Sequence, residues 1–542
     1  MTGMNVLQRA GLVAGAAMLL VPGLPAVTAT AAAPGTSAGT AATGTTAPRT
    51  TAAGTMAAAG AGRPAWCPSV EGHRVDCGSM TRPLVAGSPA LGTVDVGYAV
   101  VRHRAPGPAK GTVAVNPGGP GEVAVERAPV FGAALADLLA DHDLLLVDPR
   151  GTGVSQRIPC GVTDAEYRLG TRAQQRDAVT RCAVNLGPRA RGYTTAATAD
   201  DIDAIRARLG VDRLTLYGLS YGTYLMPVYA SRHPEHVRSI VLSGAYPLAF
   251  DPLGRSGAQA VSLSLRRICE RSAARPGAGG RPACDGDKAV RDLATTAARL
   301  REHPLDVDVP LEGAAPYRMR LTEGKLAGLA YESASREVGS DPGAPSLLGA
   351  LPHALDRFAA GDSGPLLDLV RAEGSTGSAE DQAPYIAVVC NDYRKPWKAD
   401  AAPSERWRQY RSALAGAGEG AFGAFGAAGY LEGPTDGGDV CIGWPRGNTA
   451  PPQPTHPRLP DVPVLVLSGD LDANTPDANG RQAARQFRDG RFLSVRNTGH
   501  VPELERSGCV LEVSTRFIRT GRTGDTGCTS RIEPIAVTPV RR

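Results

Sequence analysis

A serine, an aspartate and a histidine occur in this 542-residue chain in an order that suits nucleophilic catalysis. The serine lies in Gly218-Leu-Ser220-Tyr-Gly222, between a predicted strand, Arg213–Tyr217, and a predicted helix, Tyr221–Arg232. A sharp strand-to-helix turn exposes such a serine above a sheet, and flanking glycines let the strand and helix approach closely. We therefore predict that Ser220 is a nucleophile.

A serine nucleophile needs a base, and the base needs an acid that orients it. Candidates follow two later predicted strands: Asp470 and Asp472 come after Val462–Leu467, and His500 comes after Arg491–Val495. His500 is the only histidine that follows the loop carrying Asp470 and Asp472, hereafter called the acidic loop. We predict His500 as the base and Asp472 as the orienting acid, with Asp470 as the alternative.

A glycine-rich turn could supply the remaining element of such a site. A tetrahedral intermediate needs fixed N–H donors, each of which contributes roughly 3 kcal/mol to lowering the barrier. The turn Asn116–Gly121 follows an early predicted strand. We predict that the N–H of Gly119, or alternatively of Gly118, joins that of Tyr221 in an oxyanion hole. The turn lacks the Gly-Lys-Ser/Thr ending of a phosphate-binding loop.

Other segments that mimic a catalytic motif are interpreted as structural. Gly35–Gly39 also has the Gly-x-Ser-x-Gly pattern, but it lies in a low-complexity stretch, and Gly361–Gly364 joins two predicted helices. The strand end at Asp148–Gly153 is predicted to be a structural turn beside the site. Three further histidines are predicted to be structural or solvated: His233, His236 and His456.

The elements that must position these residues alternate between strand and helix up to Ala249. Short apolar runs such as Thr112–Asn116 and Leu144–Val147 are typical of buried parallel strands. From Ala249 to Pro460 helical patterns predominate instead, with Gln259–Arg275, Asp287–Glu302, Glu323–Glu337 and Leu347–Arg371 as the predicted helices. The expected fold is α/β, a doubly wound, mostly parallel sheet with a large helical cap insertion before its last strands.

The N-terminus predicts export. A short apolar run, Leu12–Leu20, follows Arg9 and ends near two prolines, which is typical of a signal peptide and too short for a membrane span. The expected organisation is a signal peptide at 1–31, an Ala/Thr/Gly-rich spacer or pro-segment at 32–62, hydrolase core at 63–249, helical cap at 250–460, further core at 461–530 and a tail at 531–542.

The ten cysteines point to the same secreted location. They fall into neighbouring pairs, and local disulfides are the expected arrangement although other pairings remain open. No Cys-x2-Cys or Cys/His cluster has metal-ligand spacing, so neither a metal nor a cofactor is predicted. The pairs are Cys67/Cys77, Cys160/Cys182, Cys269/Cys284, Cys390/Cys441 and Cys509/Cys528.

Composition excludes several classes of protein. The chain is 42% hydrophobic and 20% charged, with a net charge of +5, which is typical of a globular protein. Acidic and basic residues are mixed along the chain, so no nucleic-acid partner is predicted. Stable membrane insertion is not expected either, and nothing requires more than a monomer.

Taken together, these segments resemble α/β-hydrolase peptidases related to prolyl aminopeptidase, and most closely the secreted tripeptidyl aminopeptidases of Streptomyces type. The resemblance spans about Trp66 to Cys528. Glu122-Val-Ala124 departs from the family pattern beside the oxyanion turn, and Gly244-Ala-Tyr-Pro247 departs from it after a central strand. The segments that carry the resemblance are Asn116–Gly121, Asp148–Gly153 with Ser155, Gly218–Gly222, Cys390, Cys441–Pro445, Asp472–Pro476 and Gly499-His500.

The resemblance implies a serine exopeptidase that releases short peptides, typically tripeptides, from the free N-termini of peptides or proteins. A secreted esterase or a prolyl-aminopeptidase-like enzyme with the same triad is the alternative, because a fold and a triad do not fix the acyl group. A peptidase of this kind must bind a cationic N-terminus, and we expect carboxylates of the insertion to do so. Glu332 and Glu337 are candidates, although a solvated helix face is the better explanation of both.

Overall fold

The computed structural model describes residues 63–335, 338–341, 343–376, 381–434, 436–445 and 453–540. The predicted signal peptide and spacer, as well as Glu337, lie outside the described residues. Within them, no helix is long and apolar enough to cross a membrane.

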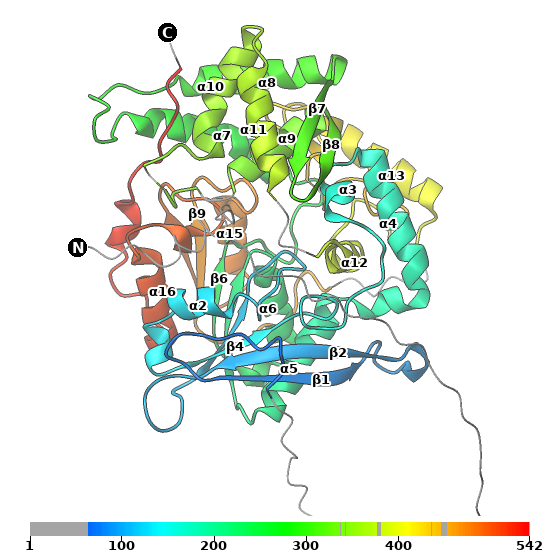
Figure 1. Ribbon diagram of the computed structural model, residues 1–542, viewed down its shortest axis with the longest axis vertical. Coiled ribbons are helices and arrows are strands. Elements are labelled where there is room, and N and C mark those ends of the chain that lie inside the picture. The colour runs from blue at the N-terminus through cyan, green and yellow to red at the C-terminus, as the bar shows by residue number, and fades with distance from the viewer. Residues whose placement is uncertain are drawn as a thin grey trace, which may run out of the picture.

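An eight-stranded sheet forms the centre of the molecule, with the order β1-β2-β4-β3-β5-β6-β9-β10 (Figure 1). The first two strands run antiparallel to their neighbours, and all pairs from β4 to β10 are parallel. This topology confirms the predicted fold class. The strands are β1 Val75–Pro83, β2 Thr93–Val101, β3 Thr112–Asn116, β4 Asp143–Val147, β5 Leu214–Leu219, β6 Val237–Ser243, β9 Val464–Gly469 and β10 Gly490–Val495.

Helices cover both faces of this sheet because successive strand residues point to opposite sides. On one face, Val113 and Val115 of β3 pack in a core that includes α2 and α16. On the other face, Ala114 shares a core with α5, α6 and α15. The covering helices are α2 Ala128–Ala134, α5 Thr195–Arg208, α6 Gly222–Arg232, α15 Asp477–Arg485 and α16 Cys509–Thr520.

The chain between β6 and β9 forms a mainly helical insertion, which Figure 1 shows gathered at one end of the sheet. Two helices from the segment after β4, α3 Asp164–Leu169 and α4 Arg172–Leu186, also contact it. The helices of the insertion are α7 Arg255–Ser272, α8 Gly286–Glu302, α9 Glu323–Ser333, α10 Leu347–Ala359, α11 Gly364–Ser375, α12 Gln382–Asp392, α13 Pro403–Ala415 and α14 Ala427–Leu431.

The insertion differs from its helical prediction at one hairpin. Strands β7 Leu305–Leu311 and β8 Ala314–Leu321 pair in an antiparallel two-stranded sheet. Val307 and Val309 are buried while Asp306 and Asp308 are exposed, which is the period of two that defines a half-buried strand. The prediction missed this hairpin because helical patterns flank it closely on both sides.

Local contacts and backbone angles define the ends of several helices. The N-cap of α5 is Thr194, whose hydroxyl accepts the N–H of Ala197. The helical segment predicted around Leu347–Arg371 consists of two helices, α10 and α11, joined at Gly361–Gly364. The break is at Gly361, whose positive φ of 99° does not fit a helix.

Five disulfides confirm the expected pairing of neighbouring cysteines, and no cysteine remains free among the described residues. The widest loop is closed by Cys390–Cys441, 51 residues apart, which ties the end of α12 to the segment before β9. This disulfide lies beside residues that contact the nucleophile turn, described below.

Candidate active site

Ser220 lies in the turn between β5 and α6, with a φ of 52°. Positive φ is uncommon for a residue with a side chain, and the surrounding contacts hold it in place. Ser220 N–H donates to the Ser243 carbonyl at the end of β6, and its own carbonyl accepts the Thr223 hydroxyl. A Cβ on Gly218 would lie 2.3 Å from the Gly222 carbonyl oxygen, so this turn needs glycine.

His500 and Asp472 form a buried pair beside this turn. His500 Nδ1 lies 2.9 Å from Asp472 Oδ2, and the Asp472 side chain is fully buried. A Cβ on Gly244, the residue after Ser243, would lie 2.9 Å from His500 Nδ1. The imidazole therefore lies against the strand end that holds Ser220, and this close contact leaves no room for a side chain at residue 244.

Thr475 completes the hydrogen bonding of the pair. Its hydroxyl donates to Asp472 Oδ2 at 2.6 Å and lies 3.0 Å from His500 Nδ1. Asp472 Oδ1 accepts the N–H groups of Asn474 and Thr475. These three donors fix the orientation of the Asp472 carboxylate, whose oxygens act as acceptors. Sequence reasoning did not single out Thr475.

Asp470, the alternative acid, points elsewhere. Its carboxylate pairs with Arg271 at 2.7 Å and accepts the N–H of Asn497 at 2.8 Å. These contacts connect the acidic loop to α7 and to the loop that carries His500. The structure thus brings Asp472, and not Asp470, to the imidazole.

The glycine turn after β3 lies against Ser220. A Cβ on Gly118 would be 2.8 Å from Ser220 Cβ, and Gly118 N–H donates to the Asn116 side chain. Within the described residues, the N–H groups of Gly119 and Tyr221 donate no hydrogen bond. Both N–H groups therefore remain available to a substrate oxygen.

The buried carboxylate of Asp392 is connected to Tyr221 through Thr195. Sequence analysis did not single out Asp392. Asp392, at the end of α12, accepts the N–H of Thr195 at 2.5 Å, and the Thr195 hydroxyl lies 2.9 Å from the Tyr221 hydroxyl. Tyr224 donates to the Asp392 carbonyl. This chain of contacts links the insertion to the residue after the nucleophile, and only the tertiary structure brings its members together.

Replacing Asp392 by asparagine is expected to change how stability depends on pH. Burial raises the pKa of Asp392 to about 6, above the ordinary value of about 4. As pH rises from 4 to 6, the unfolded chain loses this proton before the folded protein does, so the native carboxyl costs up to about 3 kcal/mol of stability above pH 6. Asp392→Asn removes that cost, and its asparagine oxygen can still accept from Thr195.

Denaturant unfolding at pH 4, 5, 6 and 7 measures the effect. Relative to the wild type, Asp392→Asn should gain stability as pH rises and level off near pH 7. The matched control is Asp368→Asn on α11, where the carboxylate is exposed and pairs only with Arg371. Parallel pH curves for the wild type and Asp392→Asn would contradict the raised pKa.

Other residues considered in the sequence have structural contacts. Asp148 is buried and accepts three backbone N–H groups, from Ala124, Val125 and Val154. Glu503, which the sequence did not highlight, accepts the Tyr217 and Ser243 hydroxyls at the ends of β5 and β6. These two carboxylates fix the loops around the nucleophile.

The fold and this site define a serine hydrolase of the α/β-hydrolase fold. A family described as alpha/beta hydrolase fold matches residues 111–277, and one described as TAP-like protein matches residues 434–530. The first match covers the nucleophile turn, and the second covers the acid and the histidine. The two halves of the candidate site therefore come from separately matched parts of the chain.

The chain is homologous over most of its length to two proteins named as peptidases and to one named as a carboxylesterase. It is 28% identical to serine protease Hip1 of Mycobacterium tuberculosis, covering 83% of this chain and 86% of the relative. It is 25% identical to the tripeptidyl aminopeptidase of Streptomyces lividans, covering 85% and 84%. Carboxylesterase B of M. tuberculosis is 28% identical, covering 80% and 82%.

Among solved structures, a proline iminopeptidase-related protein from Thermus thermophilus is similar, with 16% identity and a TM-score of 0.34. The match covers 82% of this chain and 98% of that one.

Proposed function

We propose that this protein is a secreted serine exopeptidase that releases short peptides, chiefly tripeptides, from free N-termini. The observation that carries the proposal is the buried His500–Asp472 pair beside Ser220, in a chain homologous to tripeptidyl aminopeptidase. Five disulfides support an extracellular location, because such bonds persist in oxidising compartments.

In this mechanism Ser220 attacks the scissile carbonyl while His500 accepts its proton. Asp472 and Thr475 hold the imidazole through Nδ1, which leaves Nε2 to exchange the proton. The N–H groups of Gly119 and Tyr221 bind the oxyanion. His500 then protonates the leaving amine, and a water molecule, deprotonated by His500, releases the peptide from the serine ester.

The insertion supplies a candidate anchor for the substrate ammonium. Tyr331 donates to the side chain of Asn474 in the acidic loop, so α9 lies beside the site. Burial raises the pKa of Tyr331 well above its ordinary value, and the carboxylates of Asp436 and Glu332 raise it further. The two negative charges thus act on the same region as Tyr331, and together they favour a cation there.

Asp436 is the better candidate of the two. Its charge also raises the pKa of Tyr246 and Tyr393, which burial already raises, and Tyr246 is two residues beyond Gly244 at the catalytic strand end. The nearby Lys395 is a weak competitor, because burial lowers its pKa to about 7. Near pH 7 Lys395 is therefore partly deprotonated, and a substrate ammonium, whose ordinary pKa is about 8, can compete with it for Asp436.

Asp436→Asn should weaken binding of free-amine substrates specifically. Losing a charge-assisted hydrogen bond of about 1.5–3 kcal/mol raises KM for a tripeptide amide roughly 10- to 100-fold. Hydrolysis of a nitrophenyl ester, which has no ammonium, should not change. Steady-state kinetics on both substrates test this, with Asp368→Asn as the exposed control. Equal losses on both substrates would mean that Asp436 is structural.

The function itself is tested with a panel of substrates. A chromogenic Ala-Ala-Pro amide is compared with its N-blocked form, a single-residue Pro amide and a short-chain nitrophenyl ester. Cleavage of the free tripeptide amide in preference to the other amides is the expected result. Cleavage of the Pro amide alone would assign a prolyl-aminopeptidase-like enzyme instead.

A secreted esterase with the same triad is the second candidate. The homology to Carboxylesterase B favours it, because an ester and an amide pass through similar tetrahedral intermediates at such a site. Cleavage of the ester without cleavage of any free-amine peptide would support this alternative and exclude the exopeptidase.

A further inference from the structure

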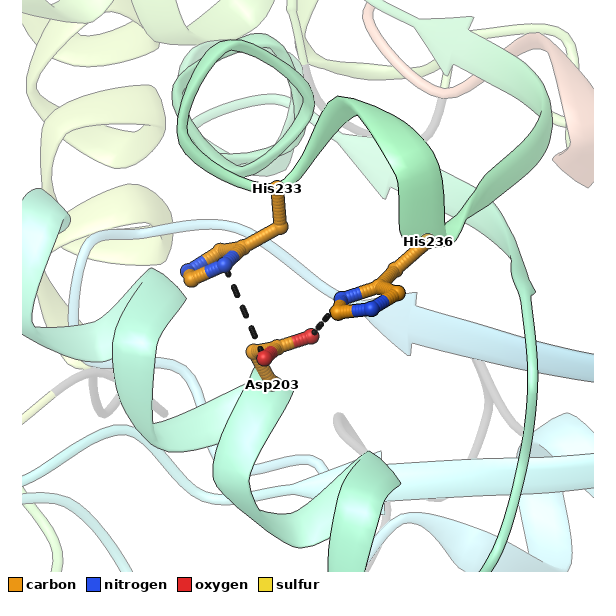
Figure 2. A group of neighbouring side chains, drawn as sticks. All are labelled: Asp203, His233 and His236. Carbon is orange, nitrogen blue, oxygen red and sulfur yellow. Dashed lines mark hydrogen bonds and ion pairs between the residues drawn. The ribbon is translucent and has the colours of Figure 1, made fainter.

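A second cluster of potential ligands lies at the opposite end of β6 from Ser220. Asp203 comes from α5, His233 follows α6, and His236 ends η4 Pro234–His236, just before β6 (Figure 2). Because β6 has 7 residues, its ends are about 20 Å apart. The cluster is therefore separate from the proposed catalytic site.

Both imidazoles direct the same ring nitrogen towards the Asp203 carboxylate. His236 Nδ1 lies 2.8 Å from Oδ1, and His233 Nδ1 lies 3.6 Å from Oδ2. The candidate ligand atoms all lie within 4.8 Å of one another. In Figure 2 the two rings lie on either side of the carboxylate, and they are nearly parallel, with an interplanar angle of 13°.

The opposite ring nitrogens face further charged groups. His233 Nε2 is 2.9 Å from Asp200, whereas His236 Nε2 lies 3.3 Å from Arg206 Nη2 and 3.7 Å from Glu235. Histidines that bind metals usually donate their other N–H to a carboxylate in this way, which fixes the tautomer. Since an ionised Asp200 can only accept, the hydrogen of His233 is on Nε2. The Nδ1 lone pair of His233 then faces Asp203 Oδ2 across 3.6 Å, a gap between two acceptors that a cation would bridge.

The neighbouring charges leave one oxygen of Asp203 for a metal ion. Oδ1 accepts from Arg206 Nε at 2.7 Å and from the Tyr229 hydroxyl at 2.9 Å, whereas Oδ2 has no hydrogen bond shorter than the 3.4 Å contact with Arg206. Arg206 and Arg232 balance two of the three carboxylates at the cluster. Metal binding at His236 Nδ1 replaces the 2.8 Å contact of that nitrogen with Asp203 Oδ1. The ring hydrogen then lies on Nε2, so the Arg206 guanidinium at 3.3 Å must turn away and Glu235 at 3.7 Å becomes the acceptor.

We propose that His233 Nδ1, His236 Nδ1 and Asp203 Oδ2 bind one divalent transition-metal ion that clamps α5 to the connection between α6 and β6. Two imidazoles and one carboxylate suit zinc, nickel or copper rather than magnesium or calcium, which prefer oxygen ligands. Water would complete the coordination. The His233 side chain is 20% exposed and lines a surface pocket of about 370 Å³ together with Arg232.

Sequence reasoning interpreted these histidines as structural or solvated because they follow a predicted helix. Asp203 lies 30 residues before His233 and reaches it only through the packing of α5 on α6. A pair of histidines near a helix end gives no indication of that neighbour.

The test uses isothermal titration calorimetry to measure zinc binding to the purified, chelator-treated full chain. We expect one saturable zinc site with micromolar affinity, no binding of magnesium, and a rise in Tm with zinc that a chelator reverses. His233→Gln and His236→Gln should each weaken binding at least tenfold and abolish the rise in Tm. His456→Gln, in a loop before β9, is the matched control and should bind zinc normally.

A third variant keeps the proposal testable if either glutamine variant fails to fold. Asp200 contacts His233 Nε2, so Asp200→Asn should weaken zinc binding about tenfold. The proposal is overturned if the wild type shows no saturable site, or if folded His233→Gln and His236→Gln bind as the wild type does. Full affinity in Asp200→Asn would also contradict the role of its carboxylate in fixing the tautomer.

Discussion

Ser220→Ala is expected to lower kcat on the free tripeptide amide by about six orders of magnitude, because it removes the proposed nucleophile of the triad. The residual rate comes from binding and from the oxyanion donors, which the substitution leaves in place. KM should change little, since Ser220 Oγ contributes to the reaction rather than to ground-state binding. A serine-directed phosphonate should label the wild type with one equivalent and the variant with none.

The fold of Ser220→Ala should be intact. The backbone contacts of residue 220 to Ser243 and Thr223 do not use its side chain, so Tm should stay close to that of the wild type. Ser363→Ala is the matched control, because Gly361–Gly364 mimics a catalytic serine loop but joins α10 to α11. Activity that survives in Ser220→Ala would assign the nucleophile to another residue.

Asp472→Asn is expected to lower kcat by about four orders of magnitude, with little effect on KM. An amide at this position can hold the imidazole in the wrong tautomer and cannot stabilise the imidazolium that forms during attack. The local fold should survive, because the Asn oxygen can still accept the N–H groups of Asn474 and Thr475. Single-turnover kinetics on the tripeptide amide measure the loss at the acylation step.

Asp470→Asn is the matched comparison, two residues away in the same loop. Its carboxylate pairs with the half-buried Arg271, so losing the charge leaves a guanidinium poorly paired and lowers stability. We expect a lower Tm but a kcat within about tenfold of the wild type, because Asp470 does not contact His500. A much larger loss of kcat in Asp470→Asn than in Asp472→Asn would make Asp470 the orienting acid.

Much of the fold was predictable because its signals are local. The Gly218–Gly222 turn carries both the strand-to-helix change and the glycines that it requires, and buried parallel strands are continuous apolar runs. The β7–β8 hairpin was missed because its period of two extends over few residues between stronger helical patterns. The pairing of neighbouring cysteines was predictable for a similar reason, since short loops favour local closure.

The sequence by itself determined the class of fold, the order of serine, acid and histidine, and the strand ends at which they lie, because strand and turn patterns act over a few residues. Only the tertiary structure decided between Asp472 and Asp470, since two carboxylates in one loop differ in where they point. It alone also placed Asp392 behind Tyr221 and Asp203 between His233 and His236. Such contacts join residues far apart in the chain, and packing rather than local pattern brings them together.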